Sequence, residues 1–481
     1  MRREAVARDR FAAPAGPLFW PLLLGSVLAC KLLLAWRFPG YLTGDDLEVL
    51  QTAGRYAWGL DYAPWSLRCL FHPFAFVWPI LEVAHGLGIR DPGILSWIGT
   101  FPAALVSTGG ALLVHALAGA WGLSEAARRA AAFLYAFHWL PLGYGATHFP
   151  RPISAVLLLA AFVLVSPPGA RPSTYAAAGV LAAAAFAVRW SEGAVLIVLL
   201  GYTWIRSRQV RPLTLVGAGF LAGMAIFVGL VDAGTWGSPF ASLREYFGVL
   251  SAGAPPASPS TDQPLLWYFA TPLRWAGPLA LLLASLGWRD ARGRRALLLF
   301  ASTVVLMSLF RYKAWRYLQS AIPFLALAAA VGWEVLRARS RPGRVLAAAA
   351  LILTIPVGLE RALTLLRDKS QSAVAAARFI AAREPSPRVV ALEQKWAFGE
   401  RVYLGNAPEI RDIPVSRPLA PSAVRLAAAG ADAVAIYAKD SSAAVERTLA
   451  DLGFRPAARF KRDASREVVV YLPVRARSRA L

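Results

Sequence analysis

The sequence is poor in the residues that build disulfide frameworks and water-facing surfaces. Its 481 residues include two cysteines, Cys30 and Cys69, which are too few for a disulfide framework. Charged residues make up 16% of the chain and hydrophobic residues 57%, with a mean hydropathy of +0.48. These values exclude an ordinary soluble protein and predict a polytopic α-helical membrane protein.

The chain also lacks the motifs of nucleotide and metal chemistry. It contains no nucleotide-binding motif, and the part from about residue 370 has no Gly-rich phosphate loop and no His or Cys set with metal-ligand spacing. We therefore expect no required cofactor and no metal site, with a divalent metal left as an open alternative.

Acidic residues are scarce beside basic ones, 28 against 51, which gives a net charge of +23. In a soluble protein this excess would suggest nucleic-acid binding. Here the basic residues gather in short loops between apolar runs, on the side of the arginine-rich residues 1–10. The positive-inside rule places that side in the cytoplasm, so we expect no nucleic-acid partner.

The apolar runs predict about 11 transmembrane helices, because a spanning helix needs about 20 apolar residues. The expected spans lie near residues 17–36, 94–121, 130–142, 151–166, 174–189, 192–205, 213–231, 266–288, 296–310, 316–336 and 345–359. We expect the protein in the cytoplasmic (inner) membrane, with its active site and C-terminal domain facing the periplasm or outside.

Two long loops and a C-terminal domain are expected on the outer side. The first loop, 38–93, is rich in Trp, Tyr and Pro, and the second, 232–265, contains a Pro- and Ser-rich flexible stretch at 253–260. From about 370 the apolar runs shorten to strand length, at 388–392, 432–437 and 467–471, and helical stretches such as 421–429 and 441–452 lie between them. We expect a transmembrane catalytic domain over 1–369 and a small soluble α/β domain over 370–481.

An acidic pair follows the first apolar span. Asp45 and Asp46 lie in the first outer loop, at the membrane surface. A carboxylate at the membrane surface is well placed to work on a lipid-linked substrate. It can act as a general base on a sugar hydroxyl. The alternative role for the pair is capping of a helix that starts near Leu47.

Basic residues near the ends of the outer-facing spans are the second candidate group. Arg311, Lys313 and Arg316 lie on the side that should be poor in positive charge. An error in the predicted topology is one explanation, and a bound phosphate is the better one, because cations crowded against a membrane need an anion. If their segment is helical, Lys313 and Arg316 share a face. Arg68 and Arg151 are expected to complete the phosphate site, although Arg151 could also be an interfacial anchor. The acidic pair and this basic group together suit glycosyl transfer from a polyprenyl-phosphate sugar. Such a reaction requires no nucleotide sugar.

A series of motifs appears in a fixed order over residues 41–324. It comprises Thr43–Asp46, Gln51, Trp58–Gly59, Trp65, Arg68, Pro73, Arg151 with Ser154, Arg189–Ser191, Asp232 with Trp236–Gly237, Trp267–Tyr268, and Tyr312–Tyr317 ahead of Pro323. In this order the chain resembles the GT-C superfold. Within it, the chain resembles glycosyltransferase family 22, the lipid-phosphate-mannose-dependent α-mannosyltransferases of GPI-anchor and N-glycan assembly.

The resemblance implies an inverting glycosyltransferase of GT-C type and a divergent, bacterial member of the family. It implies that Asp45 or Asp46 activates an acceptor hydroxyl, which displaces the polyprenyl phosphate from the sugar, with mannose as the expected sugar. It adds Gln51, Trp65, Arg189, Asp232 and Tyr268 as substrate-site candidates. The alternative role for Arg189 is an ion pair with Glu192 across a break between two helices. The family's acidic box loses its His and Pro here, and its second box loses its His and Glu, so the superfold is better supported than the sugar.

The expected partners are a lipid-linked sugar donor, a glycan, lipid or protein acceptor, and the membrane. One alternative is a GT-C transferase for another sugar or aminosugar. Another is a membrane transporter or lipid flippase, but the chain shows no inverted repeat and gathers its polar groups at one surface. A non-catalytic membrane scaffold is the remaining alternative.

Overall fold

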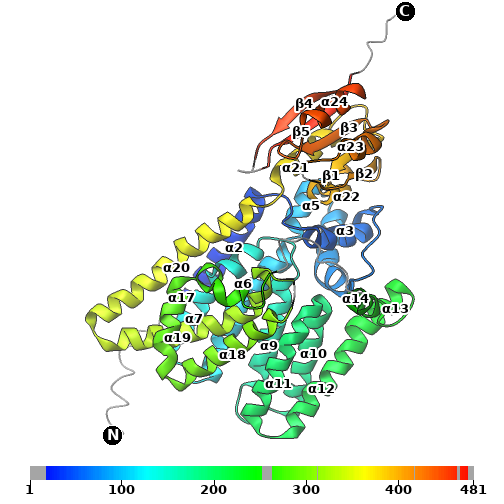
Figure 1. The fold of residues 1–481 in the computed structure, drawn as a ribbon. Coiled ribbons are helices and arrows are strands. Elements are labelled where there is room, and N and C mark those ends of the chain that lie inside the picture. The colour runs from blue at the N-terminus through cyan, green and yellow to red at the C-terminus, as the bar shows by residue number, and fades with distance from the viewer. Residues whose placement is uncertain (1–17, 252–262, 311, 417, 463–465, 475–481) are drawn as a thin grey trace, which may run out of the picture. The chain divides into compact units, whose positions relative to one another are not determined.

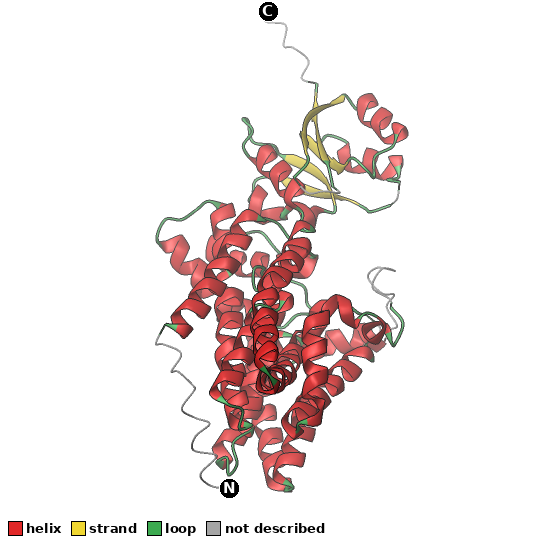
Figure 2. Ribbon diagram, turned by 90° about the vertical axis from the view of Figure 1, so that its left-hand side faces the viewer, coloured by secondary structure: helices red, strands yellow, loops and turns green. Residues whose placement is uncertain are grey.

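The computed structural model describes residues 18–251, 263–310, 312–416, 418–462 and 466–474. The chain forms two compact units. The helical unit comprises Met1–Leu33, Ser66–His72 and Pro102–Ala362, and the α/β unit comprises Leu34–Trp65, Pro73–Phe101 and Leu363–Leu481. Figure 1 labels their elements, and Figure 2 separates the helices from the strands by colour.

The helical unit is built from apolar helices joined by short turns. Its elements are most of α2 (Phe19–Arg37), α6 (Phe101–Ala120), α7 (Glu125–Ala136), α8 (Trp139–Tyr144), α9 (Arg151–Val165), α10 (Pro172–Val188), α11 (Gly193–Ser207), α12 (Val210–Met224), α13 (Val231–Trp236), α14 (Ala241–Ser251), α15 (Trp267–Ala270), α16 (Pro272–Trp275), α17 (Pro278–Leu286), α18 (Ala291–Ser308), α19 (Ile322–Arg339) and most of α20 (Arg341–Arg367). Short 3₁₀ helices cover Trp190–Glu192, Gly287–Arg289 and Trp315–Ala321, and a π-helical turn covers Ala225–Leu230.

Five helical stretches among the described residues are long and apolar enough to cross a membrane. They are Phe19–Arg37, Pro92–Ala120, Val210–Trp236, Trp315–Arg339 and Arg341–Arg367, and three shorter apolar helices are Arg151–Val165, Pro172–Val188 and Pro278–Arg289. The protein is therefore a multi-pass membrane protein, and the count of 11 spans stays a prediction.

The span expected at 266–288 is wrong as a single helix. The structure divides it into α15, α16 and α17. Pro272 begins α16, and Gly277, at φ +86°, precedes Pro278 at the start of α17. Proline lacks the N–H that would continue a helix, and glycine tolerates the positive φ, so the apolar run turns twice. The Pro- and Ser-rich stretch 253–260 lies outside the described residues.

Helices α10 and α12 pack with their backbones in contact. A Cβ added to Gly179 would lie 2.0 Å from the carbonyl oxygen of Val216, and one added to Gly219 would lie 2.0 Å from that of Ala176. Only glycine allows this approach, and small residues at helix crossings are typical of membrane helix pairs.

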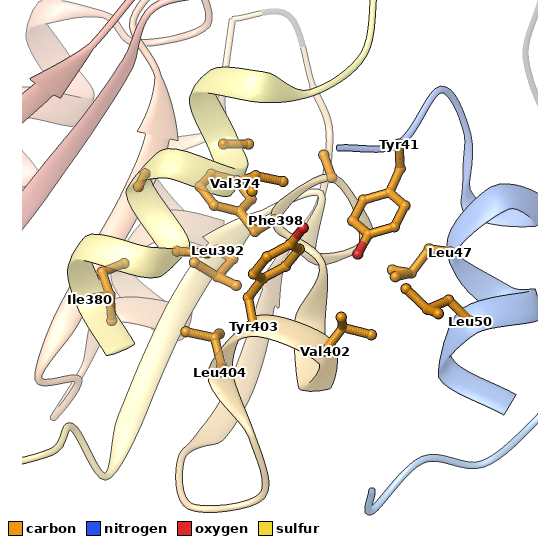
Figure 3. Close-up of a cluster of buried hydrophobic side chains, with 14 of the residues drawn as sticks. Tyr41, Leu47, Leu50, Val374, Ile380, Leu392, Phe398, Val402, Tyr403 and Leu404 are labelled. Carbon is orange, nitrogen blue, oxygen red and sulfur yellow. The ribbon is translucent and has the colours of Figure 1, made fainter. Parts of the chain in front are cut away.

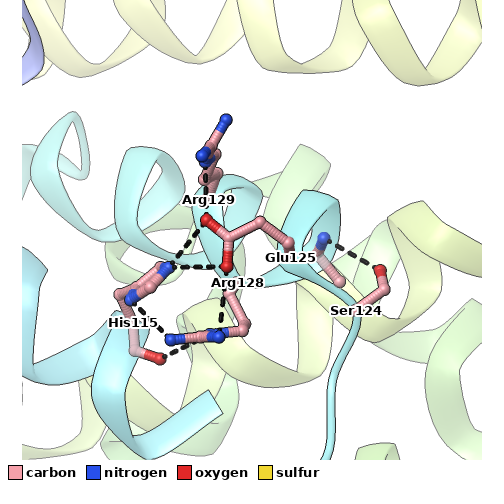
Figure 4. Close-up of polar contacts among 6 residues, drawn as sticks. His115, Ser124, Glu125, Arg128 and Arg129 are labelled. Atoms are coloured by element: carbon pink, nitrogen blue, oxygen red, sulfur yellow. Dashed lines mark hydrogen bonds and ion pairs between the residues drawn. The ribbon is translucent and has the colours of Figure 1, made fainter. Parts of the chain in front are cut away.

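Polar contacts join α6 to the start of α7 (Figure 4). Glu125 forms ion pairs with Arg128 and Arg129 at 3.1 and 2.7 Å, and His115 Nε2 lies 3.3 Å from the same carboxylate. Ser124 caps α7 by accepting a hydrogen bond from the Ala127 N–H. The basic residues of this turn are thus partly neutralised by a local carboxylate, as expected for a solvent-facing connection.

The α/β unit holds a five-stranded mixed sheet with strand order β2-β1-β3-β5-β4. The strands are β1 (Val389–Glu393), β2 (Glu409–Ile413), β3 (Ala433–Tyr437), β4 (Phe454–Phe460) and β5 (Val468–Pro473). β1 pairs with β2 and β3 in parallel, and β5 pairs with β3 and β4 antiparallel. The helices are α3 (Gly44–Trp58), α4 (Trp78–Gly86), α5 (Pro92–Ile98), α21 (Gln371–Ala381), α22 (Glu400–Leu404), α23 (Pro421–Ala428) and α24 (Ala443–Asp451).

The two faces of this sheet bury different cores. Leu392 and Val470 face a core shared with α21, α22 and α3, whereas their neighbours Ala391 and Val469 face α23 and α24. This alternation follows from the two-residue repeat of a strand. Figure 3 shows Leu47 and Leu50 of α3 beside Tyr41 and Val402 of the same cluster. The helix of the first loop is therefore part of the core of the C-terminal sheet.

The strand and helix patterns of the C-terminal part are confirmed. The runs expected as strands at 388–392, 432–437 and 467–471 form β1, β3 and β5, and the helical stretches 421–429 and 441–452 form α23 and α24. The division of the chain at residue 369 stays a prediction.

Candidate active site

The acidic pair lies in the first turn of α3, in the α/β unit. Asp46 is fully buried, and its Oδ2 accepts a hydrogen bond from the Leu42 N–H at 3.2 Å; Asp45 is half-buried. The helix begins at Gly44, three residues before the expected start, and the N-cap residue Thr43 makes no side-chain capping bond. The positive end of the helix dipole stabilises carboxylates in this position.

Lys369, which no sequence pattern revealed, lies within the electrostatic reach of Asp46. Its side chain is buried, its Nζ donates to the Phe38 carbonyl at 3.2 Å, and the charge of Asp46 acts on it. Burial lowers the pKa of Lys369 to about 8, and the Asp46 carboxylate opposes that shift. The signal that could have found it is a lysine two residues after the last apolar helix, where the chain enters the C-terminal domain.

Glu48 organises the loop that follows α3. Its carboxylate accepts hydrogen bonds from the Tyr62 hydroxyl, the Trp65 N–H at 2.9 Å and the Thr52 hydroxyl at 3.3 Å. Gln51, one turn further along, donates to Glu400 Oε2 at 3.2 Å. Of the expected substrate-site residues, Gln51 and Trp65 thus each form a hydrogen bond with a carboxylate beside or on α3.

Arginine side chains gather in the helical unit. Arg151, at the start of α9, forms a buried ion pair with Glu192 at 3.3 Å and donates to the Ser191 hydroxyl at 2.7 Å. The charges of Arg189 and Arg316 both act on Arg151. The charges of Arg68, Arg151 and Arg189 all act on the hydroxyl of Tyr246. We call Arg68, Arg151, Arg189 and Arg316 the cation cluster.

Tyr317 lies between two members of the cation cluster. The Arg151 guanidinium carbon is 3.6 Å from the centroid of the Tyr317 ring, and that of Arg316 is 5.7 Å from it. Arg316 also donates to the Tyr312 hydroxyl at 2.9 Å and lies over the Phe149 ring. Aromatic rings attract cations and hold these guanidinium groups in place.

The condition under which Lys313 and Arg316 would share a helical face is not met. Arg316 lies in the 3₁₀ helix Trp315–Ala321, but Lys313 precedes that helix. The Lys313 Nζ donates to the carbonyl oxygens of Gln263 and Phe310, at 3.0 and 2.8 Å. Ala314, between the two, has an extended backbone (φ −153°, ψ 149°), which breaks the helical repeat. Arg311 lies outside the described residues.

The remaining expected residues, Tyr268 and Asp232, form hydrogen bonds that hold neighbouring segments of the chain in place. Tyr268 is buried, and its hydroxyl bonds to both the N–H and the carbonyl of Ala314, which fixes the segment ahead of Arg316. Asp232 is buried and accepts from the Ser242 N–H and hydroxyl at 2.9 and 2.6 Å, so it ties α13 to α14. Among the described residues, no group of three His, Cys, Asp or Glu side chains could hold a metal ion.

Residues 57–394, well over half of the chain, match the Alg9-like mannosyltransferase family. The chain belongs to that family. Membership in the Alg9-like mannosyltransferase family makes this protein a membrane glycosyltransferase. None of the curated protein sequences compared with the chain matches it.

Solved structures share the GT-C fold of this family member. ArnT from Cupriavidus metallidurans bound to undecaprenyl phosphate is 14% identical, with a TM-score of 0.66 over 95% of this chain and 98% of that one. The apo oligosaccharyltransferase of Archaeoglobus fulgidus is 12% identical, with a TM-score of 0.52 over 86% and 69%. The mycobacterial arabinofuranosyltransferase AftD is 17% identical, with a TM-score of 0.52 over 93% and 39%. At these identities the likeness establishes the fold.

Proposed function

We propose that this family member transfers mannose from a polyprenyl-phosphate donor to a glycan, lipid or protein acceptor, with inversion at the sugar. The observation that carries the proposal is the cation cluster. The charges of its four arginines interact with one another or with the hydroxyl of the same tyrosine. The side chains of Arg151, Arg189 and Arg316 are at most 8% exposed. Glu192 is a carboxylate bonded to this group. Buried guanidinium groups close to one another suit a phosphate ligand.

The cation cluster would hold the donor phosphate and stabilise it as the leaving group. As the bond to the sugar breaks, negative charge grows on the phosphate oxygens, and fixed guanidinium groups stabilise that charge without reorganising. The structure of ArnT with undecaprenyl phosphate supports a lipid-linked donor for this fold. Lys313, next to the 3₁₀ helix, is a further donor-site candidate.

Asp45 or Asp46 would act as the general base. The acceptor hydroxyl gives its proton to a carboxylate and attacks the anomeric carbon from the face opposite the phosphate. No cofactor is required in this scheme, because the cation cluster would neutralise the charge that develops on the leaving phosphate.

A second sugar is the alternative within this reaction. The acidic motif of this chain has Thr43–Gly44 where the family has His-Pro, and AftD, of similar fold, is an arabinofuranosyltransferase. The alternative donor to compare with polyprenyl-phosphate mannose is therefore one that carries a pentose or an aminosugar. For either sugar we propose an inner-membrane enzyme whose acidic pair and C-terminal domain face the periplasm or outside.

The test uses membranes containing the full chain. Polyprenyl-phosphate mannose, polyprenyl-phosphate arabinose and a nucleotide-sugar control are supplied with a panel of glycan, lipid and peptide acceptors, in the presence of EDTA. We expect transfer from the polyprenyl-phosphate mannose. Transfer from the nucleotide sugar alone would refute the proposal.

A further inference from the structure

The α/β unit contains a second site, which the donor scheme does not use. A cavity of about 360 Å³ lies between the start of α3 with its following loop and the segment 395–412. This volume lies within the range of small-molecule pockets, about 300–1,000 Å³. Its polar and aromatic lining comprises Glu48, Asp61, Tyr62, Trp65, Lys395, Trp396, Glu400, Arg401 and Asp412.

The α3 wall of the cavity is fixed by Glu48. This carboxylate accepts from the Tyr62 hydroxyl and the Trp65 N–H, so both aromatic residues are anchored to the same helix. The ring of Trp65 also covers Gly44, where an added Cβ would lie 3.3 Å from it. Gly44 lines the cavity and directly precedes Asp45. The cavity therefore adjoins the turn that carries the proposed base.

The opposite wall has an unusual backbone. Gln394, Gly399 and Glu400 have φ angles of +53°, +80° and +39°, and they flank the turn that carries Trp396. Non-glycine residues rarely adopt such angles, and they cluster at binding sites. Gly399 is required, because a Cβ there would lie 2.2 Å from the Tyr403 ring.

Hydrogen bonds hold the charged groups of this wall in position. The Lys395 N–H donates to Asp412 at 2.9 Å, and Glu400 accepts from Gln51 at 3.2 Å. Arg401 donates to the Pro408 carbonyl at 2.7 Å. Burial raises the pKa of Glu400. The wall is thus built before any ligand arrives, which reduces the entropy lost on binding.

The charged and aromatic side chains that line the cavity indicate which class of ligand it can bind. Four carboxylates (Glu48, Asp61, Glu400 and Asp412) face two cations (Lys395 and Arg401), so the formal charge is −2 and a phosphate is disfavoured. Three aromatic side chains offer flat apolar faces with a negative quadrupole. A sugar ring fits both features, because its C–H face can stack on an aromatic ring while its hydroxyls donate to carboxylates.

We propose that this cavity binds a neutral or amino-substituted saccharide ring of the acceptor, stacked on Trp396 or Trp65 and hydrogen-bonded to Glu400 and Asp412. This inference rests on the proposed transferase function and adds the place in the structure where a saccharide ring of the acceptor binds. It also gives the C-terminal domain a role, since Lys395, Trp396, Glu400, Arg401 and Asp412 all come from that part of the chain.

The test measures saccharide binding directly, with the purified full chain in lipid nanodiscs. Saturation-transfer NMR is recorded with methyl α-mannoside, mannobiose, glucosamine and mannose 6-phosphate. We expect binding of the neutral or amino sugars and weaker binding of the phosphorylated one. Trp396→Ala and Asp412→Asn should each weaken binding about tenfold, the loss of one stacking or hydrogen-bonding contact. Trp78→Ala, a tryptophan of the same unit outside the cavity, should bind like the parent.

Two readouts keep this inference separate from the proposed function. Binding of radiolabelled polyprenyl phosphate should be unchanged in Trp396→Ala and Asp412→Asn. Absence of saccharide binding in the parent, unchanged binding in both variants, or preference for the phosphorylated sugar would each overturn the inference. A parent that binds saccharides but transfers nothing from any polyprenyl-phosphate sugar would instead refute the transferase proposal.

Discussion

The Arg151 guanidinium and the Glu192 carboxylate form an ion pair at 3.3 Å, with both side chains only 1% exposed. The Glu192 carboxylate also accepts from the hydroxyls of Ser154 and Ser320, at 3.2 and 2.7 Å. This single carboxylate therefore joins α9, the α10–α11 turn and the 3₁₀ helix of Arg316. It sets the positions of two members of the cation cluster.

Glu192→Gln should destabilise the protein strongly, because it leaves the Arg151 charge buried without its counter-charge. Breaking a buried pair costs about 3–5 kcal/mol. Thermal unfolding of the detergent-solubilised chain measures the effect. The control is Glu125→Gln, whose carboxylate is 43% exposed and whose loss should cost about 0–1 kcal/mol. Equal melting temperatures for the two variants would show that the pair contributes no stability.

Arg316→Ala should weaken use of the donor. A charge-assisted hydrogen bond contributes about 1.5–3 kcal/mol, so the donor KM should rise roughly 10- to 100-fold. Arg316→Lys should recover only part of this, because an ammonium cannot hold two phosphate oxygens in a fixed fork. Arg337→Ala, an exposed arginine over the Trp333 ring in the same unit, is the control. Unaltered donor dependence in both Arg316 variants would place the phosphate elsewhere.

Asp45→Asn or Asp46→Asn should abolish transfer while the protein remains folded. Loss of a general base lowers the rate by roughly 10²–10⁴-fold, whereas loss of helix capping costs about 0.5–2 kcal/mol of stability and spares the chemistry. We expect the larger rate effect at Asp45, which is half-buried, and a larger stability effect at Asp46, which is fully buried. Asp451→Asn, in an exposed pair with Arg425, serves as control. Full activity in both single variants contradicts the carboxylate mechanism.

Lys369 should give the activity an alkaline limit. Its pKa is lowered by burial to about 8, so its positive charge beside Asp46 is lost as the pH rises through 8. The pH-rate profile should therefore fall above about 8 in the parent. Lys369→Arg should keep its charge and extend the plateau to higher pH. If the rate of this variant falls at the same pH as that of the parent, a group other than Lys369 causes the fall.

The same shift has a consequence for stability. The folded-state pKa of Lys369 lies below its ordinary value of 10.5, so the unfolded chain binds more protons between about pH 8 and 10.5. The Lys369 contribution to the free energy of unfolding should therefore rise with pH in that window. Lys369→Met should remove this rise, which denaturant or thermal unfolding at several pH values can measure.

Sidedness can be tested with cysteine labels. In a chain carrying Cys30→Ser and Cys69→Ser, we introduce Gln209→Cys, beside the basic loop, or Lys439→Cys, in the C-terminal domain; both positions are exposed. We expect a membrane-impermeant thiol reagent applied to intact cells to label the second position and not the first. Labelling of both from one side would contradict the proposed orientation.

The sequence predicted the C-terminal fold well because its signals are local. Strands such as Val389–Glu393 and Ala433–Tyr437 are short apolar runs between polar turns, and their pattern depends on neighbouring residues alone. The weaker strand Glu409–Ile413 escaped prediction because it lies at the sheet edge, where charged residues replace the apolar ones. The span at 266–288 failed because hydropathy does not record the turns at Pro272 and Gly277.

The candidate site was predicted in part. Arg151, Arg189 and Arg316 stood out as charges at the ends of apolar runs, and the structure groups them. Lys369 and the 395–412 wall could not be found in this way, because their relation to α3 depends on contacts between segments more than 300 residues apart, such as that of Gln51 with Glu400. Such contacts leave no periodic signal in one sequence.

The most direct test of the central claim is single-turnover transfer from radiolabelled polyprenyl-phosphate mannose by the purified chain, in EDTA, with the released polyprenyl phosphate and the sugar product measured together. We predict that both appear in equal amounts and that the product has inverted anomeric configuration. Asp45→Asn should form neither within the time of the parent's turnover, and Arg316→Ala should form both only at higher donor concentration. Release of no polyprenyl phosphate by the parent, or a retained configuration in the product, would contradict the account.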